Sequence, residues 1–358
     1  MDLPESLADL LLPWYRANRR DLPWRKTIDP YRVWLSEIML QQTRVETVKG
    51  YYLRFLEALP DIRALAECPE DKLLKLWEGL GYYSRARNLQ KAARRIMDDW
   101  GGVFPREPES VRSLPGIGEY TAGAICSICF GLPIPAVDGN VLRVCARLTA
   151  CRADVSRRDV KRAFSEALVL RFPAAGCGDF NQALMELGAT VCIPRGTPRC
   201  EACPLSQACR SRPDERWREI PVLGQKKTRP REEIAVFLLR CGEKYALRKR
   251  PRSGLLAGLW EYPSLPGTFT PQQALDLASD WGCSPSALLK ITEREHIFTH
   301  REWHMTGFEI ACAAMSGQFV WASPQELDRV FSLPSAFRRF NAEPNVDRAE
   351  RGEKENNA

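Results

Sequence analysis

Two acidic residues stand in contexts that could support acid–base chemistry. Glu37 lies within VWLSEIMLQQT (33–43), which has helical apolar spacing, and Asp138 lies within VDGNV (137–141). An apolar flank raises the pKa of a carboxyl group, and a protonated carboxyl paired with an ionised one can break a glycosidic bond. Each residue also has a simpler explanation: Glu37 as surface charge on a solvated helix face, and Asp138 as the N-cap of the helix that follows. Capping and chemistry can coexist at Asp138.

A glycine hairpin, LPGIG (114–118), lies about twenty residues before Asp138. Gly116 allows a tight turn, and Gly118 leaves the backbone uncovered where the helical stretch 119–125 begins. Free N–H groups at a helix N-terminus bind phosphate oxygens, although an ordinary helix–helix turn would have the same sequence. A phosphate site beside a glycosidic acid pair favours an enzyme that removes a base from DNA.

Four of the thirteen cysteines form the pattern C-x7-C-x2-C-x5-C: Cys192, Cys200, Cys203 and Cys209. A [4Fe–4S] cluster takes four cysteines at irregular spacing, whereas structural zinc usually has two C-x2–4-C pairs and here there is one. The pattern therefore favours iron–sulfur over zinc. A second C-x-x-C pair, Cys126 and Cys129, lies in an apolar helical run and is interpreted as core. The odd total argues against a disulfide scaffold and for a reducing cytoplasm.

Composition places the chain among globular proteins of about two domains. It has 358 residues, 27% of them charged, and a formal charge of +7 that suits an anionic partner. No run approaches twenty apolar residues, and the stretch 1–20 is typical of an amphipathic helix and not of a signal peptide. We expect a monomeric cytoplasmic protein, associated with the nucleoid in a bacterium.

The elements that must position these residues divide into two regions of different secondary structure. Residues 1–215 are expected to be almost all helix, with the cysteine loop at 192–209, and residues 232–342 to be α+β. A basic, proline-bounded linker is predicted at 216–231 and a disordered tail at 343–358. The expected helices are 31–48, 70–78, 85–100, 119–130, 159–171 and 271–281, and the expected strands are 233–240, 244–248, 304–313 and 318–321.

Taken together, these motifs resemble the MutY-type adenine DNA glycosylases, a family of the helix-hairpin-helix superfamily that includes endonuclease III. The similarity extends from about Leu22 to Trp260, and on to about Phe340. Besides the segments quoted above, it includes LPWR (22–25), GLGYYSRARNL (79–89), LPGIGEYTAGAI (114–125), FNQALMELGATVC (180–192) and RKRPRSGLLAGLWEYP (248–263).

The resemblance implies a base excision repair enzyme that flips out adenine mispaired with 8-oxoguanine or guanine and hydrolyses its glycosidic bond. Glu37 would be the general acid and Asp138 the stabilising carboxylate. The same resemblance implies an adenine pocket, DNA contacts and a [4Fe–4S] cluster on the four cysteines. The pocket residues would be Arg25, Tyr120, Asn140 and Gln182, and the DNA contacts would include Gln42, Tyr82, Gly116 and Gly118.

The chain departs from the usual sequence pattern of this superfamily at position 120 and in the spacing of its first two clustered cysteines. Bifunctional relatives carry at position 120 a lysine that forms a Schiff base, and Tyr120 cannot do so. The family usually has six residues between its first two cysteines, and seven separate Cys192 from Cys200.

The second half resembles a Nudix domain that recognises a base without hydrolysing nucleotides. Phe298, Thr299 and His300 resemble the loop that meets 8-oxoguanine, where the family usually has serine in the middle. The glutamate-rich magnesium helix of Nudix hydrolases is missing. Three rival functions remain open: a bifunctional glycosylase/lyase, a non-catalytic iron–sulfur DNA-binding protein, and a nucleotide-pool hydrolase.

Overall fold

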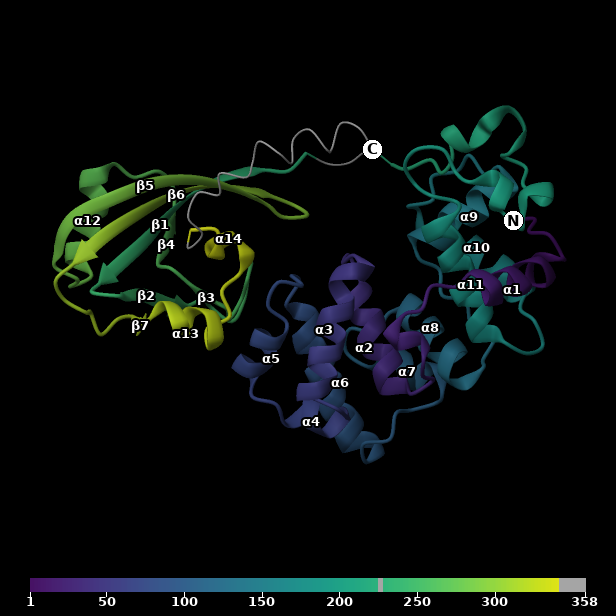
Figure 1. Cartoon of the computed structure of the whole chain (residues 1–358), viewed down its shortest axis with the longest axis horizontal. Helices are drawn as coiled ribbons and strands as arrows, with labels where there is room; N and C mark the ends of the chain where they lie inside the picture. Colours follow the sequence, from purple (N-terminus) through teal and green to yellow (C-terminus); the bar gives the residue numbers. More distant parts are fainter. Residues whose placement is uncertain (225–227, 341–358) are drawn as a thin grey trace. The chain divides into compact units, whose positions relative to one another are not determined.

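The computed structural model describes residues 1–224 and 228–340, which form two compact units (Figure 1). The first unit contains residues 1–68 and 84–224, and the second contains residues 69–83 and 228–340. Residues 69–83 are expected from the sequence to belong to the first domain, but in the structure they group with the second unit. Within that unit the Glu78 carboxylate accepts a hydrogen bond from the Leu333 N–H at 2.8 Å, which anchors the segment.

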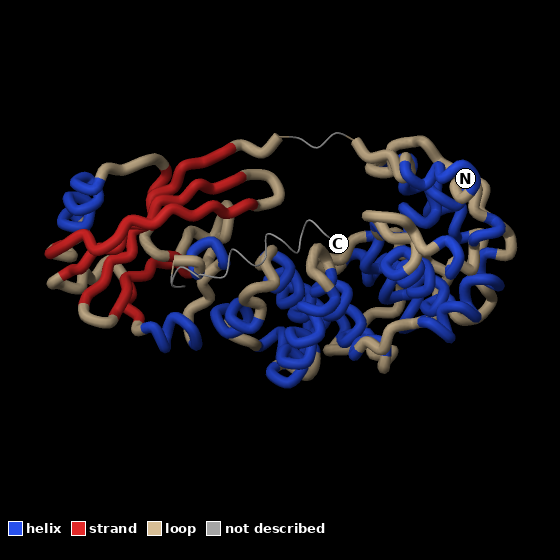
Figure 2. Tube along the Cα trace, turned by 45° about the horizontal axis from the view of Figure 1, so that its top comes forward, coloured by secondary structure: helices blue, strands red, loops and turns tan. Residues whose placement is uncertain are grey.

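The first unit is helical, as predicted, and Figure 2 shows it without strands among its described residues. Its α-helices are α1 (Leu7–Asn18), α2 (Pro30–Leu40), α3 (Val45–Ala58), α4 (Ile62–Glu67), α6 (Ser84–Trp100), α7 (Pro108–Ser113), α8 (Glu119–Phe130), α9 (Gly139–Thr149), α10 (Arg158–Val169) and α11 (Cys177–Thr190). Short 3-10 turns are η1 (Pro23–Arg25), η2 (Cys200–Ala202), η3 (Ser206–Ala208) and η4 (Pro213–Arg218).

The predicted single helix 31–48 is wrong, because the chain breaks between α2 and α3. Asp29 caps the start of α2 by accepting a hydrogen bond from the Arg32 N–H at 2.9 Å, and Pro30 occupies the first turn. The helix ends before Gln42, whose φ of 58° lies in the left-handed region that an α-helix of L-residues cannot continue through. Glu37 is thereby kept on a short helix of its own.

Glycines let the elements around the candidate site approach one another closely. A Cβ at Gly123 of α8 would lie 2.2 Å from the Pro135 carbonyl oxygen, and one at Gly178 of α11 would lie 2.6 Å from Ile128 Cα. Helix α11 also packs against α9 and α1 around a continuous apolar core. As a result, the backbone of α8 lies in direct contact with the backbone of α11 and of the segment that leads into α9.

The second unit is a mixed sheet with helices on both faces. The strand order is β3-β2-β1-β6-β5; β4 pairs with β1 and β7 with β2, and β1 runs parallel to β6. Alternate residues of β1 enter different cores: Val236 and Leu238 pack toward α13 and α14, and Phe237 and Leu239 pack toward α12. The elements are α5 (Glu70–Leu76), β1 (Arg231–Cys241), β2 (Lys244–Lys249), β3 (Trp260–Glu261), β4 (Ser264–Pro266), α12 (Pro271–Asp280), β5 (Pro285–Ile297), β6 (Glu302–Cys312), β7 (Val320–Ala322), α13 (Pro324–Arg329) and α14 (Ser335–Arg338).

The start of the predicted linker 216–231 belongs to the first unit in the structure. Trp217 and Ile220, at the start of the predicted linker, are buried in the first unit, and Val222 forms a β-bridge with Asp154 there. The predicted tail 343–358 lies outside the described residues. Among the described helices, none is both long and apolar enough to cross a membrane.

Candidate active site

Glu37 is a buried carboxyl in the middle of α2. Its residue is 7% exposed, and one carboxylate oxygen accepts a hydrogen bond from the Tyr120 hydroxyl of α8 at 2.7 Å. Burial raises the pKa of Glu37 to about 7; the Tyr120 hydrogen bond and Arg25 oppose the rise, and the Asp138 charge adds to it. Glu37 is therefore not a solvated surface charge, and it can hold a proton near neutral pH.

Asp138 is the N-cap of α9 and also faces the Glu37 pocket. One of its oxygens accepts the Val141 N–H at 2.8 Å, and the other accepts the Asn140 side-chain amide at 2.7 Å. Burial raises the pKa of Asp138 above its ordinary value, and these hydrogen bonds and the nearby Arg143 only partly offset that rise. Its charge raises the pKa of both Glu37 and Tyr120, so the two carboxyls act on one another.

Arg143 connects the Asp138 turn to the cysteine region. Its guanidinium donates to Asn140 Oδ1 at 2.9 Å, to the Gly188 carbonyl at 2.7 Å and to the Cys192 carbonyl at 2.7 Å. Because one side chain bridges the start of α9 and the end of α11, displacement of Cys192 would disturb the turn that carries Asp138.

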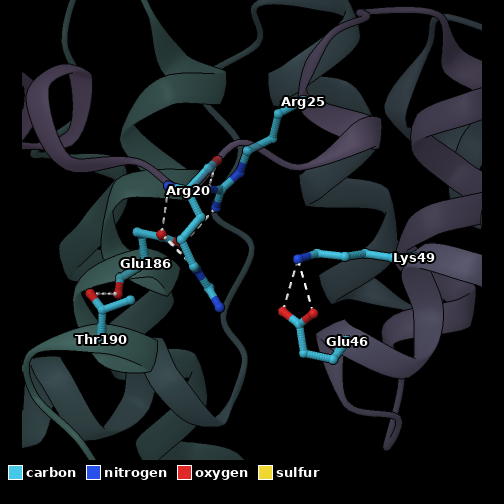
Figure 3. A network of polar contacts seen from close by, with 6 residues as sticks. All are labelled: Arg20, Arg25, Glu46, Lys49, Glu186 and Thr190. Carbon is cyan, nitrogen blue, oxygen red and sulfur yellow. Dashed lines mark hydrogen bonds and ion pairs between the residues drawn. The ribbon is translucent and has the colours of Figure 1, made fainter.

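Glu186 is a buried carboxylate beside the candidate site that sequence reasoning missed. It lies on α11 with its side chain 0% exposed, accepts bonds from Arg20 Nε and Nη2 at 2.8 Å each, and accepts another from Arg25 Nη2 at 2.8 Å (Figure 3). Burial opposes ionisation, but the two arginines outweigh it and lower the pKa of Glu186 to about 2. The only sequence signal was one acidic residue in the otherwise apolar run ALMELGA.

Arg25 is thereby held at the mouth of the Glu37 pocket. It also donates to the Arg20 carbonyl at 3.2 Å and lies over the Tyr15 ring at 5.5 Å from the centroid. Its positive charge reaches Glu37 and lowers that carboxyl's pKa. The other expected pocket residue of α11, Gln182, is partly buried one turn before Glu186. The structure thus brings Glu37, Asp138, Tyr120 and Arg25 into one electrostatic neighbourhood.

The glycine hairpin has the expected backbone form. Gly116 has a φ of 80°, and a Cβ there would lie 2.8 Å from Asn88 Cβ. Gly118 is the N-cap of α8, and a Cβ there would meet nothing within 4 Å. Since glycine has no side chain, position 118 leaves the first N–H groups of α8 open. Gln42 is exposed in the turn after α2, where Arg85 donates to the Gln41 carbonyl at 2.7 Å.

In the second unit the structure brings two expected contact residues together. The Tyr82 hydroxyl and the Thr299 hydroxyl are hydrogen-bonded, and Tyr82 has a φ of 46°. Phe298 packs edge-on against the rings of His296 and Trp303, with centroids 4.5 and 4.9 Å apart. His300 is exposed at the tip of the same turn.

The four clustered cysteines line one pocket of about 360 Å³, including space open to solvent, together with Arg147, Arg212 and Trp217. Arg147 donates to Cys192 Sγ at 3.4 Å, and the Cys209 thiol lies 3.5 Å from the Arg147 carbonyl oxygen. Among the described residues, no three His, Cys, Asp or Glu side chains gather tightly enough to hold a single metal ion. The extra residue between Cys192 and Cys200 leaves all four thiols on the cavity wall.

Comparisons with known proteins agree with this division. The HhH-GPD superfamily base excision DNA repair protein model matches residues 35–169, and the NUDIX domain model matches residues 235–343. A solved thermostable thymine-DNA glycosylase is 31% identical, covers 58% of this chain and 95% of its own, and has a TM-score of 0.54.

Relatives that match most of this chain identify its family. The Homo sapiens adenine DNA glycosylase is 37% identical over 81% of this chain and 64% of its own length, so this chain spans less than two thirds of that relative. The Rattus norvegicus adenine DNA glycosylase is 36% identical over 86% of this chain and 70% of its own length. These matches confirm the resemblance found in the sequence: the chain belongs to the adenine DNA glycosylase family, within the HhH-GPD superfamily of base excision repair proteins.

Proposed function

We propose that this chain hydrolyses the glycosidic bond of adenine in duplex DNA when 8-oxoguanine or guanine lies opposite. The observation that carries the proposal is the buried Glu37 carboxyl, whose pKa of about 7 lets it donate a proton at neutral pH. Asp138, its partner across the pocket, has two hydrogen-bond donors that favour its ionised form.

The reaction begins when the adenosine leaves the base stack, because its C1′–N9 bond is unreachable inside a duplex. Hairpin amides near Gly116 and Gly118 hold a flanking phosphate, while Gln42 contacts the duplex. Arg25, Gln182 and Asn140 then hold the extruded base beside Glu37.

Bond cleavage divides between the two carboxyls. Glu37 gives its proton to N7 of adenine, and the C1′–N9 electron pair leaves with the neutral base. Asp138 stabilises the oxocarbenium-like sugar or bonds briefly to C1′, and water supplies the hydroxyl that leaves an abasic site. Tyr120 orients Glu37 and has no amine with which to form a Schiff base, so strand cleavage is not part of the reaction.

The second unit supplies selectivity. Phe298, Thr299 and His300 meet the 8-oxoguanine of the opposite strand, and Tyr82 enters the base stack beside it. A normal adenine·thymine pair lacks this contact and is refused. We assign the catalytic role to the first unit (residues 1–68 and 84–224) and the recognition role to the second unit (residues 69–83 and 228–340). The chain would act as a monomer where chromosomal DNA lies, which in a bacterium is the cytoplasmic nucleoid.

Cys192, Cys200, Cys203 and Cys209 fit a [4Fe–4S] cluster. Four cysteines lining one cavity provide the donor set of a cuboidal cluster. When bound, the cluster stabilises the fold around the loop 192–209. Iron and acid-labile sulfide in equal amounts in the purified protein would support the assignment, and stoichiometric zinc would overturn it.

The test of the activity measures free adenine released from duplexes with 8-oxoguanine, guanine or thymine opposite adenine. We expect release from the first two duplexes and none from the third. Glu37→Gln should abolish release while duplex binding persists. Full turnover by that variant would remove Glu37 from the acid role.

The runner-up function is a glycosylase with lyase activity. Borohydride traps a Schiff base as a stable protein–DNA adduct. We expect no adduct with the wild-type chain and a weak one with Tyr120→Lys. An adduct with the wild type would make the lyase the better assignment.

A further inference from the structure

An open groove in the first unit has no role in the function proposed above. It encloses about 1670 Å³, including space open to solvent, and is lined by parts of α7, the first turn of α8, the segment 134–137 and one face of α10. Tyr120 lines this groove and also donates to Glu37, and Val137 in the lining directly precedes Asp138. The groove therefore opens at the catalytic pocket.

The α10 wall of the groove is polar and mainly cationic. Its lining residues recur at helical spacing, so they share one face of α10, and they are Arg158, Lys161, Arg162, Ser165 and Glu166. The opposite face is buried in the core through Val160, Phe164 and Leu168. The core thus fixes which way the cations point.

Charge on this wall is only partly neutralised. Glu166 is paired with Arg162 at 2.8 Å. No carboxylate in the described part of the chain lies within ion-pair distance of Arg158 or Lys161, and both residues are exposed. Across the groove, Arg112 pairs with Glu109 at 3.9 Å, and Glu119 is the second acidic residue of the lining, so four cations face two acids. The groove therefore offers net positive charge to a ligand.

We infer that this groove holds the sugar–phosphate backbone of the adenine-bearing strand, next to the extruded nucleotide, with Arg158 and Lys161 binding its phosphates. The inference rests on the proposed function. A pocket for free adenine, which is neutral, would have apolar and aromatic walls. The cationic lining of this groove is instead suited to the phosphates of a DNA backbone. The first turn of α8, directly after the Gly118 amides, forms one end of the groove, so one strand can pass from hairpin to α10.

The test measures equilibrium binding to an 8-oxoguanine·adenine duplex over a range of salt concentrations, in a Glu37→Gln background that prevents turnover. Removing Arg158 and Lys161 together (to Ala) should weaken binding about tenfold and lower the slope of log affinity against log salt by about 2. The matched control removes Arg152 and Arg157, two exposed cations that are ion-paired and lie outside the groove. Equal effects of the two double variants would overturn the inference.

Neutral methylphosphonate linkages assign the strand. Placed within about two nucleotides of the adenine, they should weaken binding by the parent and cause little further loss in the Arg158/Lys161 variant. The same linkages on the opposite strand should affect both proteins alike. If only the opposite-strand linkages show this difference, the groove holds the other strand and the inference is wrong.

The two proposals can fail separately. If the chain with Glu37 intact releases no adenine but the groove variant still loses duplex affinity, the proposed activity fails and the groove stands. If adenine is released normally and the groove variant binds like its control, only the groove assignment fails.

Discussion

Glu37 and Asp138 are carboxyls of one pocket that receive different numbers of hydrogen bonds. Glu37 is bonded by one hydroxyl, whereas Asp138 is bonded by a backbone amide and a side-chain amide. Burial raises the pKa of both carboxyls, and hydrogen-bond donors oppose that rise by stabilising the ionised form. On this ground the proposed function gives the acid role to Glu37, which has fewer donors, and the anion role to Asp138.

Single-turnover adenine release should therefore fall as pH rises through about 7, because Glu37 must be protonated to act. In Tyr120→Phe the hydrogen bond that lowers the pKa of Glu37 is lost, so the falling limb should move upward by about one unit. The pH dependence of the single-turnover rate measures both. A limb that stays in place or moves downward would show that Tyr120 does not set the proton affinity of Glu37.

The same raised pKa has a cost in stability. The folded state holds the Glu37 proton more tightly than the unfolded chain, so the penalty is absent below pH 4.5, grows above it and is complete above about pH 7. A rise from 4.5 to about 7 corresponds to roughly 3 kcal/mol. Glu37→Gln should thus be more stable than wild type at pH 8 and nearly equal at pH 4, as measured by urea unfolding. Equal stability at both pH values would contradict the raised pKa.

Among the elements, α11 joins the two ends of the catalytic unit through Glu186. The helix is more than 160 residues from its arginine partners in sequence, so no local pattern could reveal the contact. Its carboxylate fixes Arg25, which in turn faces Glu37. The positions of α1, η1 and α11 relative to one another are therefore set by one buried charge cluster as well as by apolar packing.

Glu186→Gln should destabilise the fold by roughly 3 kcal/mol at pH 7, because Arg20 and Arg25 lose the buried anion that both of them bind. The pKa of Glu186 is lowered, so its contribution is present above pH 4.5 and is lost as pH falls toward 2. Glu46→Gln is the matched control, since Glu46 pairs with Lys49 at 2.9 Å on the surface and its side chain is 79% exposed (Figure 3). Chemical unfolding at pH 7 and pH 3 tests both variants, and equal losses would contradict the cluster's role.

The sequence predicted an element well where its apolar periodicity and its ends were both visible in the local sequence. Helices with clear ends, such as α6 and α8, were predicted within a residue or two. The break at Gln41–Arg44 was missed because apolar spacing continues across it, and only the φ of Gln42 reveals the turn. Strand β5 was missed because its sequence, PSALLKITEREHI, has no regular apolar alternation and carries charged residues through its second half, so pairing with β6 defines it.

The residues of the candidate site could be proposed from the sequence alone, and their roles stay predictions. Motifs gave Glu37, Asp138 and the cysteines, because each lies in a short segment with its own chemical logic. Their meeting in one pocket depends on α2, α8 and α9 packing together, which no single segment encodes. Residues 69–83 illustrate the same limit, since their grouping with the second unit depends on partners such as Leu333.

Over the whole molecule, the proposed function assigns the chemistry to the first unit and the selectivity to the second. Thr299→Val removes a hydroxyl but keeps the shape, so the second unit would lose a hydrogen bond and little packing. We expect the rate of adenine release opposite 8-oxoguanine to fall toward the rate opposite guanine, because an unpaired polar contact costs about 1–3 kcal/mol.

The measurement is the ratio of the two single-turnover rates, which cancels damage to the catalytic unit. Thr292→Val, the same substitution on β5, is the control and should leave the ratio unchanged. If Thr299→Val slows both duplexes equally, Thr299 contributes to general DNA binding and not to choosing the opposite base. If it changes neither rate, selectivity lies elsewhere in the second unit, and the assignment of the Phe298–His300 turn is wrong.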